Sequence, residues 1–148
     1  MNHLKLKAAS LLFSAVLLAG CGLTDEKITM KPETGENIQV TLDRGDDFSM
    51  EESSGVLVVY QKKKVMRRGA FISREQEQAQ RASIITMPFE IHREEQNYIS
   101  YSMGGPDGMV NYYMYPVGKK TWLYAATHLP PEAAEKVLSR IHFKEGSE

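Results

Sequence analysis

The spacing of hydrophobic and polar residues predicts a chain built mainly of β-strands. In IQVTL, residues 38–42, every second residue is apolar, which is the pattern of a half-buried strand. The more continuously apolar GVLVVYQ, residues 55–61, predicts a second strand. It leads through KKKVMRR, residues 62–68, into GAFIS, so we expect a β-hairpin with a highly charged tip.

The second half of the chain predicts an antiparallel meander followed by a helix. IITMPFEIH, YISYSM, MVNYYMYP and TWLYAATH are strand-like, and the turns between them, such as residues 104–108, are too short for crossover connections. Pro88 cannot donate to a ladder, so the first of these strands is expected at an edge or a bulge. Residues 129–143 begin with two prolines and carry one apolar face, which predicts an amphipathic helix lying on the sheet.

A further helix is expected at residues 73–82. Ser73 and Gln76 are spaced as a capping box, although the segment has only two apolar residues and a partial loop is the alternative. Together these elements predict an α+β fold: a mostly antiparallel sheet of about six or seven strands with a C-terminal helix packed on it.

The N-terminal twenty residues have the plan of a signal peptide. Lys5 and Lys7 precede an almost wholly apolar run of about eleven residues. A bilayer-spanning helix needs about 18 or more apolar residues, so this run is too short to remain as an anchor.

The residues Leu18-Ala19-Gly20-Cys21 resemble the lipobox of bacterial lipoproteins. The resemblance implies cleavage between Gly20 and Cys21, lipidation of the Cys21 thiol, and a place in the bacterial cell envelope with the domain outside the cytoplasm. Two or three acyl chains hold a protein on a membrane almost permanently. The alternative is a buried cysteine of an unrelated segment.

We therefore expect residues 1–20 to be a signal peptide, 21–37 a lipidated cysteine with a flexible tether, and 38–148 a single α+β domain. Because Cys21 is the only cysteine, no thiol remains for a disulfide, a metal site or a nucleophile. Without its first twenty residues the chain has 16 basic and 19 acidic side chains, a balance that argues against nucleic acid as a partner.

The body of the chain resembles the PsbP-like family, which includes small bacterial lipoproteins of the DcrB type. The resemblance covers residues 37–144 and rests on the leading ENIQVTL strand, the GVLVVY strand, the hairpin and the terminal LPPEAAEKVLSRIHF. It implies a non-enzymatic domain that binds partners or assists assembly.

Two sets of residues are candidates for a partner surface. The basic tip could meet anionic headgroups or a partner's acidic patch, and its alternative role is to protect an edge strand from aggregation. Exposed aromatic residues on the late strands would make a protein-binding platform, and ordinary sheet packing is their alternative. The candidates are Lys62, Lys63, Lys64, Arg67, Arg68, Tyr113, Tyr115 and Trp122.

No catalytic residue, metal ligand or cofactor is assigned from the sequence. The acidic stretch from Asp43 to Glu52 lacks the calcium-loop pattern, because the twelfth residue from Asp43 is Ser54, and we expect a solvated loop. Glu90 and His92 share one face of a predicted strand. The leading hypothesis is thus a lipid-anchored, non-enzymatic protein that binds another envelope protein; the rival is a small-ligand or metal-binding lipoprotein with its pocket among Glu90, His92 and the tyrosines.

Overall fold

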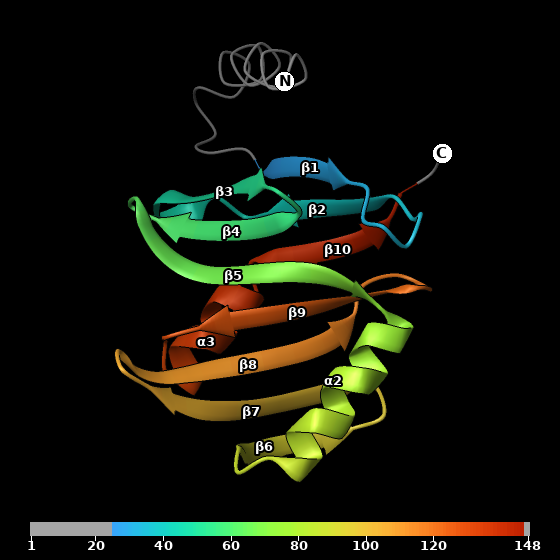
Figure 1. Ribbon diagram of the computed structural model, residues 1–148. Helices are drawn as coiled ribbons and strands as arrows, with labels where there is room; N and C mark the ends of the chain where they lie inside the picture. Colours follow the sequence, from blue (N-terminus) through green and yellow to red (C-terminus); the bar gives the residue numbers. More distant parts are fainter. Residues whose placement is uncertain (1–24, 147–148) are drawn as a thin grey trace, which may run out of the picture.

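The computed structural model describes residues 25–146, which fold into two β-sheets and two α-helices (Figure 1). The helices are α2 (Arg74–Thr86) and α3 (Pro131–Leu138), and a short 3-10 helix, η1, spans Gly45–Asp47. The strands are β1 (Glu26–Met30), β2 (Ile38–Leu42), β3 (Phe48–Ser53), β4 (Val56–Gln61), β5 (Lys64–Ser73), β6 (Glu90–Glu95), β7 (Tyr98–Gly105), β8 (Gly108–Pro116), β9 (Thr121–Thr127) and β10 (Ile141–Glu145).

The larger sheet has seven strands in the order β3-β4-β5-β9-β8-β7-β6, and each neighbouring pair is antiparallel. The predicted meander is confirmed as β6 to β9, with β6 at the edge. The smaller sheet has the order β1-β2-β10 and is also antiparallel. The α+β fold class and its mostly antiparallel sheet are therefore confirmed.

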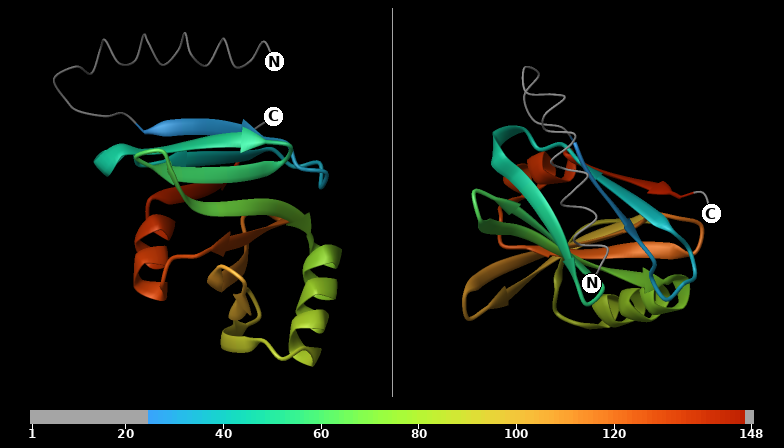
Figure 2. Two further views of the ribbon diagram at one scale, coloured as in Figure 1. Left: turned by 60° about the vertical axis from the view of Figure 1, so that its left-hand side comes forward. Right: turned by 90° about the horizontal axis from the view of Figure 1, so that it is seen from above.

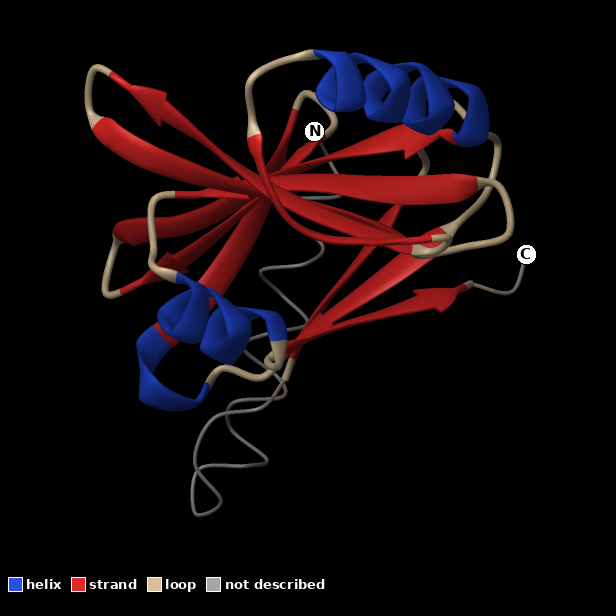
Figure 3. Cartoon of the chain, turned by 90° about the horizontal axis from the view of Figure 1, so that it is seen from below, coloured by secondary structure: helices blue, strands red, loops and turns tan. Residues whose placement is uncertain are grey.

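The two faces of the larger sheet are covered differently. Figure 2 shows the smaller sheet lying alongside β3, β4 and β5, and the apolar residues between the two sheets form the main core. The two helices lie on opposite faces of the larger sheet (Figure 3). Val137 of α3 joins the main core, whereas Ile84 of α2 belongs to a second cluster with Tyr101 and Trp122.

Alternation along β9 explains how one strand serves both clusters. Leu123 and Ala125 point into the main core, and Trp122 points to the α2 side. Successive side chains of a strand face opposite sides, so a strand that is covered on both faces is apolar almost throughout.

The predicted flexible tether over residues 21–37 is wrong for residues 26–30, which form β1. Ile28 and Met30 are each 6% exposed, because they pair with β2 and close one side of the main core. Ile28 and Met30 are the only apolar residues of this strand, and two such positions were too few to show the alternation that predicts a strand. The solvated loop expected up to Glu52 is likewise wrong from residue 48 onward: Phe48 and Met50 are buried, and the stretch forms the outer strand β3.

The helix expected at residues 73–82 is confirmed and is longer than predicted. The amide of Gln76 donates to Ser73 Oγ at 3.1 Å, and the amide of Ser73 donates to Gln76 Oε1 at 2.8 Å, which is the predicted capping box. The helix continues to Thr86, so the strand expected from residue 84 is wrong at its start. Ile84, which is fully buried, supplies the apolar contact that residues 73–82 lack.

Candidate functional site

The predicted lipidation site lies outside the described residues. Gly20 and Cys21 precede residue 25, so the lipid anchor and the signal peptide stay predictions. Among residues 25–146, neither α-helix has the length and apolar character needed to cross a bilayer.

The charged tip of the β4–β5 hairpin is confirmed as an exposed basic surface, although it is narrower than predicted. Lys62 and Lys63 form a two-residue turn with positive φ values of 50° and 68°, and Lys64 already starts β5. Lys62, Lys63, Lys64 and Arg68 are all exposed. In the described part of the chain, none of these four side chains takes part in an ion pair. Their charges therefore face solvent without an ion-pair partner, and among the described residues the one carboxylate that lines the groove beside the hairpin turn is that of Asp47.

Arg44 extends this surface and was missed by sequence reasoning. It lines an open groove of about 430 Å³ together with Asp47, Phe48, Ser49, Lys62 and Lys63. Its Nε atom is buried and has no hydrogen-bond partner among residues 25–146. No local signal in the sequence marks Arg44, because it stands in an acidic stretch and meets the hairpin only through the fold. We call Arg44, Lys62, Lys63, Lys64 and Arg68 the basic end.

Arg67 does not belong to the predicted partner surface. It is only 6% exposed, and its Nη2 donates to the hydroxyl of Tyr115. The register of β4 and β5 shifts between Val59 and Tyr60, and this bulge lets Arg67 point inward while Arg68 points to solvent. Burial raises the pKa of the Tyr115 phenol despite the nearby guanidinium, so the hydroxyl stays protonated.

The predicted aromatic platform is also wrong. Trp122 is 3% exposed, because α2 covers it with the guanidinium groups of Arg74 and Arg81 at 5.3 and 6.0 Å from the ring. Tyr113 and Tyr115 lie on the opposite face and pack, half-buried, against the main core. These aromatic residues hold the sheet layers together and present no shared exposed surface.

The structure brings a second group of polar residues together in an open groove of about 460 Å³. The group combines two residues of the sequence-predicted pocket, Glu90 and His92, with residues from β7, β8 and the loop after β9. We call this site the polar groove and define it by Glu90, His92, Ser102, Asn111 and His128. Sequence reasoning found the first two from their spacing and missed the others, which only strand register could place. The tyrosines expected in this pocket are not among its lining residues.

A chain of hydrogen bonds runs under the imidazole of His92. Its Nε2 bonds to Ser102 Oγ, which donates to Asn111 Oδ1 at 2.5 Å. The Asn111 Nδ2 group in turn donates to the carbonyl of Leu129 at 2.8 Å. Ser102 and Asn111 are 3% and 8% exposed, whereas the His92 side chain is 40% exposed. The ring thus sits at the surface on a buried polar support.

A β-bulge explains the position of His92. In the pairing of β6 with β7, Ile91 faces Tyr101 and Arg93 faces Ser100, so His92 is the extra residue without a partner in the register. A bulge re-aims side chains, and bulges are common beside functional sites. Here the bulge directs the imidazole onto Ser102, across the strand pair.

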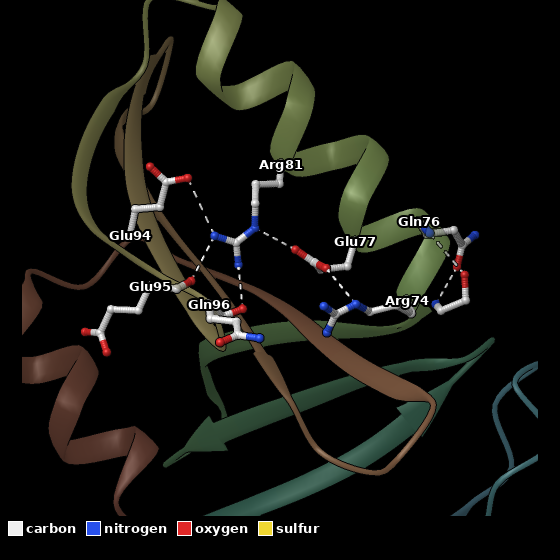
Figure 4. Close-up of polar contacts among 8 residues, drawn as sticks. Arg74, Gln76, Glu77, Arg81, Glu94, Glu95 and Gln96 are labelled. Carbon is white, nitrogen blue, oxygen red and sulfur yellow. Dashed lines mark hydrogen bonds and ion pairs between the residues drawn. The ribbon is translucent and has the colours of Figure 1, made fainter.

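A buried carboxylate on α2 fixes the strand that carries this histidine (Figure 4). Glu77 is 2% exposed and accepts from Arg81 Nε at 2.7 Å, with Arg74 Nε 3.7 Å away. Arg81 also donates to the carbonyl of Glu95 at 2.9 Å. Because Glu95 ends β6, this cluster ties the edge of the sheet to the helix, and we assign it a structural role.

The comparisons with known proteins assign no family to the chain. No family model, no curated protein and no solved structure matches it. Within residues 25–146, no three histidine, cysteine, aspartate or glutamate side chains gather in a way that could hold a metal ion.

Proposed function

We propose that the protein is a lipid-anchored, non-enzymatic protein of the bacterial cell envelope, which uses its basic end to bind an acidic surface of another envelope protein. The observation that carries the proposal is the basic end itself: four exposed cations of the hairpin and the half-buried Arg44 beside them, none of which forms an ion pair in the described residues. A surface on which five cations stand beside the carboxylate of Asp47 carries a net positive charge, and such a surface favours association with a surface of the opposite sign.

The place of the basic end relative to the chain's N-terminal side supports this proposal. The Met50 amide donates to the Glu26 carboxylate at 3.3 Å, and the Lys62 amide donates to the Asp47 carbonyl at 3.1 Å. The start of β1 and the hairpin tip thus both contact the short segment of residues 47–50, where η1 ends and β3 begins. Glu26 follows Cys21 by five positions, a reach of at most about 18 Å. A lipid on Cys21 would therefore keep the basic end close to the membrane surface, where a membrane-bound partner is accessible.

Lysine footprinting in native membranes tests the proposal. A partner on the basic end should reduce acetylation of Lys62, Lys63 and Lys64 several-fold relative to the detergent-purified protein. Lys119 and Lys120 are matched exposed lysines in the turn before β9. Thr121 of β9 pairs with Ser73, at the opposite end of β5 from Lys64, so their labelling should not change. Equal labelling of both sets in the two preparations would contradict partner binding at the basic end.

Two further measurements separate the parts of the proposal. The intact mass of the membrane-extracted protein should correspond to a chain starting at Cys21 with two or three acyl groups, and an unmodified thiol would contradict the anchor. The footprint is then repeated with the purified protein in vesicles that contain anionic phospholipid. Protection of the three lysines there, with no other protein present, would identify headgroups as the acidic surface and overturn the protein partner.

A second candidate function is small-ligand binding, and the polar groove favours it. The groove exposes an imidazole on a buried polar support, and the register of three strands assembles it. Concave sites with a few convergent polar groups are the usual places for small ligands.

A further inference from the structure

The hydrogen-bond chain beneath His92 determines which ring nitrogen carries the proton. A backbone carbonyl only accepts, so the bond to Leu129 fixes the Asn111 amide with Nδ2 toward Leu129 and Oδ1 toward Ser102. The single hydroxyl proton of Ser102 is then used on Asn111. Ser102 Oγ must accept from His92, so the proton of the neutral imidazole is on Nε2 and the lone pair is on Nδ1.

This assignment excludes a hydrolytic serine in the resting site. A serine nucleophile donates its proton to the histidine that acts as its base. Here the hydrogen bond runs in the opposite direction, because His92 donates and Ser102 accepts, and the Ser102 side chain is buried. The network orients His92 and leaves its Nδ1, which lies near the exposed Glu90 carboxylate, as an acceptor.

The polar groove therefore presents acceptors and negative charge. His92 Nδ1 lies 3.9 Å from Glu90 Oε1, and neither atom supplies a proton to the other while the ring is neutral. Asp107 adds a second carboxylate and His128 a second imidazole, and among residues 25–146 no lysine or arginine lines the groove. Two facing acceptors are satisfied when a donor or a cation lies between them. Met109 and Pro130 line the same groove and give it an apolar surface.

We propose that the polar groove binds an organic cation with an aliphatic portion, whose primary ammonium or guanidinium group lies between Glu90 and His92 Nδ1. The aliphatic portion lies against Met109 and Pro130. A metal ion fits less well, because the described residues offer no set of three metal-ligating side chains at one point. This inference rests on the second candidate function and names its ligand class; it does not depend on the lipid anchor or on the basic end.

Titration calorimetry on the full chain in detergent at pH 8 tests the ligand class. The probes are agmatine, which has a guanidinium and an ammonium group on a four-carbon chain, butyrate, which has a similar apolar part and a negative charge, and Zn²⁺. We expect agmatine to bind and butyrate not to bind. The agmatine Kd should rise at least tenfold in Glu90→Gln and in His92→Ala. His142→Ala is the matched control, because His142 is exposed on β10 and lies outside the groove. The agmatine Kd of this variant should stay within twofold of the wild-type value.

The outcomes separate the two levels of the argument. If butyrate binds as well as agmatine, or if Zn²⁺ binds and agmatine does not, the ligand class is overturned while small-ligand binding stands. If none of the three probes binds, both are overturned. Glu90→Gln keeps the test free of folding effects, because the Glu90 side chain is 70% exposed.

Ser102 and Asn111 are positioning residues in this account, and a spectroscopic measurement distinguishes that role from a structural one. The ¹⁵N shifts of the His92 ring should show one tautomer, protonated at Nε2, in the wild-type protein. Ser102→Ala removes the acceptor and should give a mixture of tautomers together with a several-fold weaker agmatine Kd. An unchanged single tautomer in the folded variant would overturn the role assigned to the network.

Discussion

Glu77→Ala should destabilise the domain far more than deletion of an exposed charge on α2. The change removes the carboxylate that is 2% exposed and leaves Arg81, whose side chain is 18% exposed, without its 2.7 Å partner. Breaking a buried ion pair costs about 3–5 kcal/mol when the surviving charge has no other partner. Arg81 keeps the Glu95 carbonyl and lies 3.6 Å from Glu94, so we expect a smaller loss, about 2–3 kcal/mol.

Chemical denaturation measures this loss directly, and a melting curve should show it as a fall in Tm of about 4 °C per kcal/mol for a domain of this size. Glu75→Ala is the control: Glu75 is exposed in the first turn of the same helix, and its loss should stay within about 0.5 kcal/mol. Hydrogen exchange should also become faster in β6, because Arg81 holds the end of that strand. If the Glu77 and Glu75 variants have equal stability, the structural role of the cluster is refuted.

Two further predictions concern the ends of elements. Ser73→Ala removes the side chain that caps α2 and should cost about 1 kcal/mol of unfolding free energy in urea denaturation; an unchanged midpoint would contradict the cap. For Glu36, burial raises the pKa of the carboxyl, but hydrogen bonds from the Thr121 hydroxyl and from the amides of Lys120 and Lys119 outweigh it, so the pKa is lowered overall. The stability that ionised Glu36 contributes is then complete above the ordinary carboxyl pKa and is lost as the pH falls through the lowered pKa of the folded state. The difference in unfolding free energy between wild type and Glu36→Gln should therefore shrink as the pH drops below about 4. A difference that is constant from pH 7 to pH 3 would contradict this.

The parts of the fold that were predictable are those whose signal is local. Alternation predicted β2 and the last three strands of the meander, short turns predicted their antiparallel order, and the capping residues predicted the start of α2. The alternation at Ile85 and Met87 placed the first strand of the meander too early, because these residues lie at the end of α2. The division into two sheets was not predictable, because it depends on the pairing of β10 with β2 at opposite ends of the domain sequence. A period of two tells which face a residue takes and carries no information about the partner strand.

The same limit applies to the candidate sites. The basic residues of the hairpin were visible as a run in the sequence, but the inward turn of Arg67 follows from a bulge and the contribution of Arg44 from tertiary packing. Trp122 looked like a surface candidate because strand patterns assign alternate faces without saying which face a helix covers. The pair Glu90 and His92 was visible from spacing, whereas its buried support was not.

The bulge at His92 has an alternative explanation, which is protection of the sheet edge. All six residues of β6 are exposed at an edge of the larger sheet, and bulges and charged side chains are common devices against edge-to-edge pairing. That purpose needs only the bulge and the charges on β6. It does not need a hydroxyl and an amide buried beneath the ring, since apolar residues at positions 102 and 111 would pack the same face without polar groups to satisfy. The buried pair therefore points to a requirement on the orientation of His92, and this requirement favours a ligand site over edge protection alone.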